Sequence, residues 1–468
     1  MPDSAAFPAP DDDLLPGTRR ALMHRLAVGQ ADGRTPSVTA AVVRGGRMVW
    51  CGGRGLADGQ DPDGDTQYRI GSISKTIIAI MTMRLRDAGL LDLADPLSRH
   101  LDVPQAGGAT VAQLLSHTSG LVSESGGPWW ERTPGELRPK LADIFPPRPL
   151  VHQAGRRFHY SNPGYALLGA LISRLRDGRP WGDVVREEVL GPLGMTRTTL
   201  DPRPPHERGW AVHPWADVLQ PEPAEDTGQM APAGQYWSTA ADMSRLAAFL
   251  LDGNRRVLAD ETLAEMRAPA SGPDDESWTG SYGLGVQLLR RDGQVLYGHT
   301  GSMPGFISAL CVSAADGLAG VALANVTSGA DPVGIALGLI AIVAEHEPSL
   351  PARWQPLPEV DQDLLALTGL WYWGPRPYLL RLLPGRGLAL SPDAGRGRNS
   401  RFRAEADGTW TGLDGYYAGE TLRLVRDASG AVGHIDLATF VFTREPYDTG
   451  APLAARPDPD GWQAGQPG

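Results

Sequence analysis

The chain has 468 residues, a formal net charge of −11 and a hydrophobic fraction of 41%. This mixture is typical of globular proteins and excludes wholesale disorder, and the length predicts about two or three domains. The negative charge and the lack of any dense basic run argue against a nucleic-acid-binding protein. Two cysteines, Cys51 and Cys311, can build neither a disulfide framework nor a four-thiolate metal site. The longest apolar run, 333–344, is too short to span a membrane.

Hydrophobic periodicity and turn signals predict an alternation of helices and strands along residues 17–346. In chain order we expect a helix at 17–30, strands at 36–45 and 47–55, helices at 72–90, 112–116, 163–176 and 239–251, strands at 282–290, 294–297, 307–313 and 318–325, and a buried helix at 332–345. Strands at both ends enclose a middle of helices and long loops. This order indicates an α/β sheet domain with a helical insert.

The two ends of the chain differ in composition from this domain. Residues 1–16 are rich in proline and aspartate and predict a flexible arm, without the positive start and apolar stretch of a secretory signal. We therefore expect a cytoplasmic protein. Residues 347–359 are proline-rich and predict a linker. Short apolar runs between turn signals then predict a small all-β barrel or sandwich within 360–468, followed by a loose tail.

A Ser-x-x-Lys motif, Ser72 to Lys75, opens the predicted helix at 72–90. Residues three apart share a helix face, so the Lys75 amine should lie beside the Ser72 hydroxyl. The helix N-terminus would offer a free N–H and the positive end of its dipole to an oxyanion. Only Lys75 and Lys140 are lysines among the 43 basic residues. Because lysine, unlike arginine, can lose its proton, Lys75 is a candidate base for a Ser72 nucleophile, although chance spacing is an alternative.

A second motif, Tyr160-Ser161-Asn162, stands in a tight loop before a helix that begins with proline. A phenol near a cationic lysine would have a lowered pKa and could relay protons, which makes Tyr160 a candidate relay. The Asn162 amide would bind a substrate carbonyl. Taken alone, the triplet fits a buried structural tyrosine equally well.

A third motif, His299-Thr300-Gly301-Ser302, stands at the end of a predicted strand. Gly301 would let a ligand approach the backbone closely, and the Ser302 N–H would be a second oxyanion donor. A histidine at this position would carry a weak, pH-dependent charge. This triplet alone also fits a structural role.

In this order, the three motifs resemble those of the penicillin-recognising serine enzymes, which include class C β-lactamases, D-alanyl-D-alanine peptidases, D-aminopeptidases and related esterases. Segments 114–121 and 233–242 are also similar to that family. The resemblance covers about residues 17–346 and implies a β-lactamase/transpeptidase-like fold, an antiparallel sheet flanked by helices with a helical subdomain. It implies these site residues: Ser72 as nucleophile, Lys75 as base, Tyr160 and His299 as further catalytic residues, Ser72 and Ser302 N–H groups as the oxyanion hole, and Asn162, Gly234, Trp237, Thr300 and Gly301 as substrate contacts.

The β module after residue 359 narrows this resemblance to the penicillin-binding-protein-type thioesterases of nonribosomal peptide assembly, which carry a lipocalin-like C-terminal module. The resemblance implies a peptide cyclase that takes a peptidyl thioester from a peptidyl carrier protein, without a cofactor or metal. It also makes Arg444 a candidate for binding the peptide's carboxylate end, with a structural ion pair as the alternative. A cytoplasmic esterase or D-amino-acid peptidase of the same fold remains open, and a catalytically silent binding protein is disfavoured because all three motifs are intact. Trp129 and Trp130 fit an acyl-pocket wall and a core position equally well.

Overall fold

The computed structural model describes residues 14–55, 61–106, 108–273, 279–291, 293–351 and 353–446. The chain divides into two compact units, Met1–Leu350 and Pro351–Gly468. Most of the predicted N-terminal arm and the predicted C-terminal tail lie outside the described residues. Within the described part of the chain, no helix has the length and apolar character that a membrane span requires.

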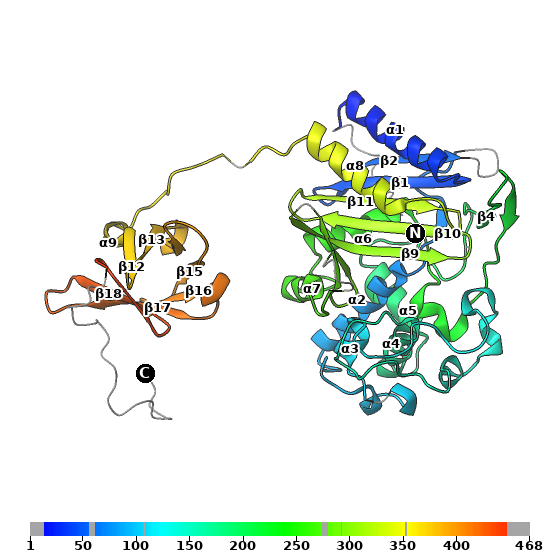
Figure 1. Ribbon diagram of the computed structural model, residues 1–468, viewed down its shortest axis with the longest axis horizontal. Coiled ribbons are helices and arrows are strands. Elements are labelled where there is room, and N and C mark those ends of the chain that lie inside the picture. The colour runs from blue at the N-terminus through cyan, green and yellow to red at the C-terminus, as the bar shows by residue number, and fades with distance from the viewer. Residues whose placement is uncertain are drawn as a thin grey trace, which may run out of the picture. The chain divides into compact units, whose positions relative to one another are not determined.

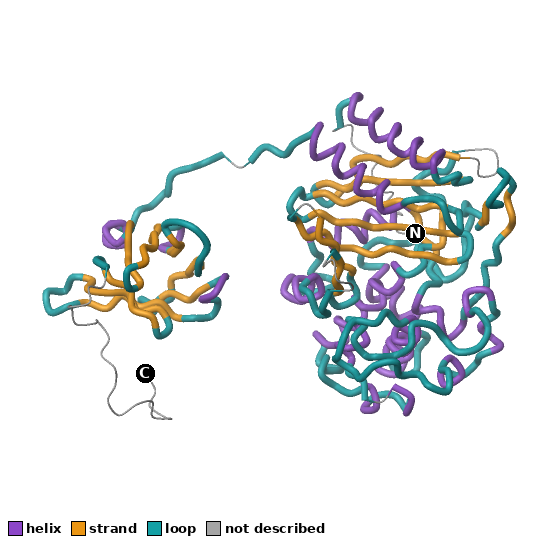
Figure 2. Tube along the Cα trace, viewed as in Figure 1, coloured by secondary structure: helices purple, strands orange, loops and turns teal. Residues whose placement is uncertain are grey.

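A seven-stranded antiparallel sheet forms the centre of the first unit, with strand order β2-β1-β11-β10-β9-β8-β7. Its strands are β1 (Ser37–Arg44), β2 (Arg47–Gly55), β7 (Gly280–Tyr282), β8 (Gln287–Arg291), β9 (Gln294–Met303), β10 (Phe306–Ser313) and β11 (Leu318–Ala324). Helices α1 (Pro16–Asp32) and α8 (Pro332–His346) cover one face, while α2 (Ile73–Asp87) and α6 (Ala240–Asp252) lie on the other (Figure 1, Figure 2).

Alternation along β1 explains why the sheet is covered on both faces. Val38, Ala40 and Val42 belong to the core beneath α1 and α8, whereas Ala41 and Val43 belong to the larger core around α2 and α6. Successive strand residues point to opposite faces, so an uninterrupted apolar strand requires two apolar layers.

The remaining helices and short strands of this unit build the insert beside the sheet. They are α3 (Val111–Leu115), α4 (Asn162–Leu175), α5 (Trp181–Val185), α7 (Asp260–Arg267), and the two-stranded pairs β3 (Gln67–Arg69) with β6 (Trp237–Thr239) and β4 (Trp210–Val212) with β5 (Leu219–Pro221). The Ser161 hydroxyl accepts from the Gly164 N–H and so caps α4, and Thr239 caps α6 through the Asp242 N–H. Both helices begin where the sequence predicted.

The predicted strand at 282–290 is wrong in one respect, because a turn divides it into β7 and β8. Gly285 adopts a positive φ of 82°, and a Cβ there would lie 2.0 Å from the Ala79 Cβ of α2. The chain therefore reverses direction in a tight turn that contains this glycine, and β7 and β8 pair with each other across it. Strand β9 in turn runs to Met303, so it contains the whole third motif.

The second unit is a closed barrel of eight antiparallel strands in sequential order. After the short helix α9 (Gln362–Leu367), the strands are β12 (Gly369–Trp373), β13 (Arg376–Leu382), β14 (Leu388–Pro392), β15 (Ser400–Ala404), β16 (Trp410–Gly412), β17 (Thr421–Arg426), β18 (Val432–Leu437) and β19 (Phe440–Thr443). Large side chains such as Trp371, Tyr378, Phe402 and Phe442 fill its interior. This barrel fits the predicted lipocalin-like module.

Candidate active site

Ser72 stands at the start of α2, where the backbone makes a sharp entry into the helix. Gly71 before it adopts a positive φ of 53°, and a Cβ at Gly71 would lie 2.4 Å from the Ser302 backbone nitrogen. Only glycine combines this conformation with so close an approach. The N-terminus of α2 is therefore held against the third motif on β9.

Lys75 lies one turn into α2 and is buried, whereas Ser72 is half-buried. The Lys75 Nζ is 2.8 Å from the Ser72 Oγ and 2.6 Å from the Ala233 carbonyl oxygen, to which it donates. Burial lowers the pKa of Lys75 to about 7, although the carboxylates of Glu124 and Glu131 oppose this shift. A neutral amine at hydrogen-bonding distance from a serine hydroxyl can accept its proton.

Tyr160 completes the group around the serine. Its hydroxyl is hydrogen-bonded to Ser72, and its ring centroid lies 5.0 Å from the Lys75 Nζ. The expectation of a lowered pKa is wrong, because desolvation by burial raises the pKa of Tyr160 and outweighs the hydrogen bond from Ser72. The phenol therefore stays protonated near neutral pH, and it passes a proton only as it receives another.

His117 positions Tyr160, a role that the sequence did not reveal although it lies in the family-like segment 114–121. Its ring centroid is 4.1 Å from that of Tyr160, and its Nδ1 accepts from the Ser161 N–H. Burial holds the pKa of His117 well below its usual value. The neutral ring thus supports the Tyr160 loop from behind by stacking and by one backbone hydrogen bond.

The third motif reaches the serine through close backbone contact. A Cβ at Gly301 would lie 1.9 Å from the Ile70 carbonyl oxygen, so glycine is required where β9 crosses the chain before Ser72. This contact brings Ser302 beside Gly71. The two predicted oxyanion donors, the backbone N–H groups of Ser72 and Ser302, therefore lie on segments in close contact.

The protonation state of His299 differs from the pH-dependent charge that we expected. Its Nδ1 is 2.6 Å from the Thr300 carbonyl oxygen, which can only accept, so Nδ1 carries the proton and Nε2 accepts from the Tyr282 hydroxyl at 2.7 Å. Burial lowers the pKa of His299 to about 3, with the nearby Lys75 adding to the shift. His299 is therefore neutral near pH 7 and offers no charge to a substrate carboxylate.

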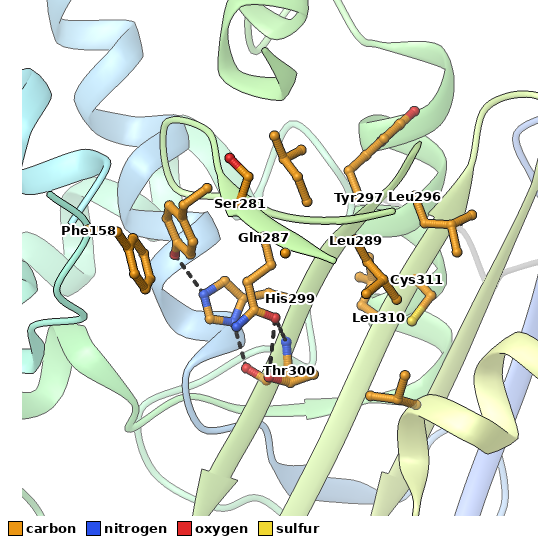
Figure 3. A pocket seen from close by; sticks show the side chains of 15 residues that line it. Phe158, Ser281, Gln287, Leu289, Leu296, Tyr297, His299, Thr300, Leu310 and Cys311 are labelled. Carbon is orange, nitrogen blue, oxygen red and sulfur yellow. Dashed lines mark hydrogen bonds between the residues drawn. The ribbon is translucent and has the colours of Figure 1, made fainter. Parts of the chain in front are cut away.

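A cavity of about 250 Å³ is lined by His299, Phe158 and Tyr282 among other residues (Figure 3). Figure 3 shows Gln287 beside Thr300, whose N–H and hydroxyl both donate to the Gln287 carbonyl oxygen at 2.9 and 3.2 Å. The sequence did not single out Gln287. It satisfies the polar groups of Thr300 that a substrate was expected to use.

Asn162 binds the carboxylate of Glu124, which acts on the pKa of Lys75. Its amide nitrogen donates to both carboxylate oxygens of Glu124 at 2.9 and 3.0 Å, and the Trp130 indole donates to Glu124 at 2.7 Å. Glu124 lies in an irregular loop where no sequence pattern marked it. Trp130 is a core residue, whereas Trp129 is 56% exposed and donates to Glu131.

Three other predicted residues have contacts of their own. Gly234 lies near Met303, whose Sδ would be 3.1 Å from a Cβ at this glycine. The Trp237 ring is buried with its centroid 5.1 Å from that of Phe306, and its backbone pairs with Thr199. Arg444 belongs to the second unit and forms no ion pair among the described residues. Its guanidinium donates instead to the carbonyls of Ala366, Thr368 and Leu370.

Comparisons with known proteins agree with this geometry. A family model described as beta-lactamase matches residues 20–345, and a model described only as a domain of unknown function matches residues 360–444. A human beta-lactamase-like protein is 29% identical over 287 residues, which cover 55% of this chain and 56% of the human one. The chain thus matches about half the length of that relative. The predicted β-lactamase/transpeptidase-like fold is confirmed.

Two solved structures extend the comparison. The D-amino acid amidase of Ochrobactrum anthropi in complex with D-phenylalanine is 26% identical, with a TM-score of 0.58, and the match covers 69% of this chain and 99% of the amidase. The protein SurE is 25% identical, with a TM-score of 0.57, and the match covers 92% of this chain and 99% of SurE.

Proposed function

Because the chain belongs to the beta-lactamase family, we propose that it is a serine acyltransferase acting on peptides. Ser72 takes the acyl group of a peptidyl thioester from a carrier protein, and the peptide's own amine then releases it as a macrolactam. The observation that carries this proposal is the buried Lys75, whose pKa of about 7 leaves a neutral amine 2.8 Å from the Ser72 hydroxyl.

In the acylation step, Lys75 accepts the Ser72 proton as the oxygen attacks the thioester carbonyl. The Ser72 and Ser302 N–H groups receive the resulting oxyanion. When the tetrahedral intermediate collapses, the carbon–sulfur bond breaks and the ammonium of Lys75 returns the proton to the leaving thiolate, with Tyr160 as the relay. The products are the Ser72 ester and a free thiol.

In the release step, an amine attacks the ester and must lose a proton. Neutral Lys75 accepts that proton and then protonates the Ser72 oxygen as it leaves. Glu124 supports an amine as the second substrate, because a carboxylate near Lys75 attracts an ammonium group and disfavours a second carboxylate. The neutral His299 likewise provides no cation for an acid such as a penicillin carboxylate.

A second candidate is a D-amino-acid amidase or peptidase, or an esterase, which the similarity to the D-amino acid amidase favours. The same Glu124 would then attract the substrate's own α-ammonium. The match to SurE, which extends over the barrel as well, favours a chain that uses both units. The two candidates share acylation of Ser72. They differ in the group that leaves during this step, a thiol or else an amine or alcohol, and in the group that attacks the acyl-enzyme, the peptide's own amine or water.

Peptidyl thioester mimics that end in a D-residue separate the two candidates. We expect mainly macrolactam, which mass spectrometry distinguishes from the linear acid because it is lighter by one water. Several peptide sequences are needed, each compared with its N-acetylated form, which has no free amine to close the ring. The hydrolase would replace the cyclase as the proposed function if simple esters or amides turn over rapidly and every accepted peptide gives only linear acid.

A further inference from the structure

Four connections of the barrel meet at one of its ends. In an antiparallel barrel with sequential strands, every second connection lies at the same end. The connections β12–β13, β14–β15, β16–β17 and β18–β19 therefore share one mouth. Each contributes a large side chain there: Trp373 at the end of β12, Arg398 before β15, Tyr416 before β17 and Phe440 at the start of β19.

Arg398 occupies the centre of this cluster. Its guanidinium carbon is 4.0 Å from the ring centroid of Tyr416, 4.5 Å from that of Phe440 and 5.1 Å from that of Trp373. The rings also contact one another, with 5.5 Å between the centroids of Trp373 and Phe440. Stacking on aromatic faces fixes the plane of a guanidinium and leaves its N–H edge to recognise an anion.

The charge of Arg398 is not balanced by the barrel. In the described part of the second unit, the ion pairs are formed by other arginines and one histidine, and none includes Arg398. Arg398 has a side-chain hydrogen bond with Tyr417, whereas its Nη1 is covered and has no hydrogen-bond partner. A buried donor without a partner is unfavourable, and arginine cannot shed its charge to avoid this.

A cavity of about 630 Å³ shares Tyr416 and Phe440 with the cluster and is further lined by Tyr417, Thr421, Glu420 and Arg423, but not by Arg398 or Trp373. The interior below is filled by aromatic and aliphatic side chains. A ligand must therefore sit in the mouth rather than deep inside the barrel.

We propose that this mouth is a binding site for a carboxylate attached to a flat apolar group. The carboxylate would pair with the Arg398 guanidinium, whose fork matches two carboxylate oxygens. The apolar group would pack against Tyr416, which is 58% exposed, and against Trp373, which is 36% exposed. Large aromatic rings at a barrel mouth with one convergent charge are typical of a small-molecule site.

Calorimetric titration of the full chain tests this site. The probes are N-acetylphenylalanine and a tetrapeptide ending in phenylalanine, each compared with its neutral C-terminal amide. We expect saturable binding of at least one acid and at least tenfold weaker binding of its amide, as for loss of a charge-assisted hydrogen bond. Binding of the tetrapeptide alone identifies a peptide C-terminus as the ligand, and binding of both acids identifies a small carboxylic acid.

Variants locate the binding. Arg398→Gln and Tyr416→Ala should each weaken binding of the acid about tenfold, while Arg381→Gln, which alters an exposed arginine of β13 outside the mouth, should leave it unchanged. The exposed Tyr416 can be truncated without opening the core, so a folding defect in Arg398→Gln would not obscure the result. The proposal is overturned if no acid binds, if acid and amide bind equally, or if neither variant weakens binding. Acylation of Ser72 does not enter this readout.

Discussion

Each of the two units places a basic side chain among aromatic rings, but the two side chains differ in protonation state. In the first unit, Lys75 lies 5.0 Å from the Tyr160 ring centroid and 5.7 Å from that of Tyr165, and burial lowers its pKa to about 7. In the second, Arg398 lies within about the same distance of three rings. Lysine can avoid the free-energy cost of a buried charge by losing its proton, whereas arginine remains charged.

This difference relates each side chain to a chemical role. A buried lysine that is half deprotonated near pH 7 is a base, and an arginine in similar surroundings is a fixed positive charge that attracts an anion. It also offers a reason why lysine is retained at position 75 in a chain with 41 arginines and one other lysine. The predictions below test the two halves of this comparison.

Replacing Ser72 has the largest expected effect. Ser72→Ala should abolish covalent labelling by a fluorophosphonate or a peptidyl thioester, because among the described residues the Lys75 amine is hydrogen-bonded to the Ser72 hydroxyl and to the Ala233 carbonyl. Intact-protein mass spectrometry would show the missing adduct. Ser74→Ala is the matched control, since Ser74 is buried and its Oγ accepts from the Tyr236 N–H. Labelling that survives Ser72→Ala but not Ser74→Ala would reverse the assignment.

Lys75→Arg separates proton transfer from charge. Arginine keeps the positive charge but cannot accept the serine proton, so the acylation rate should fall ~10²-fold or more. Lys140→Arg is the matched control, because it changes the other lysine, which is exposed, and should acylate like the parent chain. Thermal unfolding of both variants checks that the larger side chain still fits. Acylation of Lys75→Arg at the parent rate would exclude Lys75 as the base.

The pH dependence tests whether the neutral lysine is the active form. Since the folded-state pKa of Lys75 is about 7, the acylation rate should rise with pH through a midpoint near 7 and fall about tenfold per unit well below it. His299 contributes nothing to this limb, because its pKa is lowered to about 3. A single-turnover rate that is flat between pH 5 and pH 8 would contradict this assignment.

Glu124→Gln sharpens the same measurement. The Glu124 carboxylate stabilises the protonated lysine and so raises its pKa, and removing that charge should move the midpoint to lower pH. Glutamine can still accept hydrogen bonds from Asn162 and Trp130, so the loop should keep its structure. A midpoint displaced to higher pH would mean that Glu124 acts on acylation by another route than through Lys75.

The order of elements and the group around Ser72 were predictable because they depend on local rules. A three-residue spacing on a helix brings Ser72 and Lys75 together, and hydrophobic periodicity marked the sheet and its covering helices. Two strands of the barrel do not stand out as short apolar runs in the sequence. Strand β16 has only three residues, and β18 mixes Gly433, His434 and Asp436 with its apolar residues, which obscures its alternation.

The features of the site that could not be predicted from the sequence depend on tertiary environment. The pKa values of Tyr160 and His299 are set by burial, which no local pattern reveals, so the lowered pKa expected of Tyr160 and the charge expected of His299 were both wrong. Glu124 lies in an irregular loop, and its contact with Asn162 joins residues that are 38 positions apart in the chain. Arg398 becomes notable only when four separate connections meet at one end of the barrel.

Arg444 gives the smallest expected effect and completes the comparison of the barrel's arginines. Its guanidinium carbon lies 4.2 Å from the Trp371 ring centroid, and its donors meet three backbone carbonyls next to α9 and β12. Three backbone carbonyls thus accept from its guanidinium, and we expect its main contribution to be to folding. Because these contacts are largely exposed, Arg444→Met should lower the free energy of unfolding of the barrel by only about 1 kcal/mol.

Chemical denaturation monitored by tryptophan fluorescence measures this loss, and peptide KM is measured on the same variant. A raised KM with unchanged stability would instead support the role in binding a peptide carboxylate that the sequence suggested, and Arg398 would then not be the only anion-binding arginine of this unit.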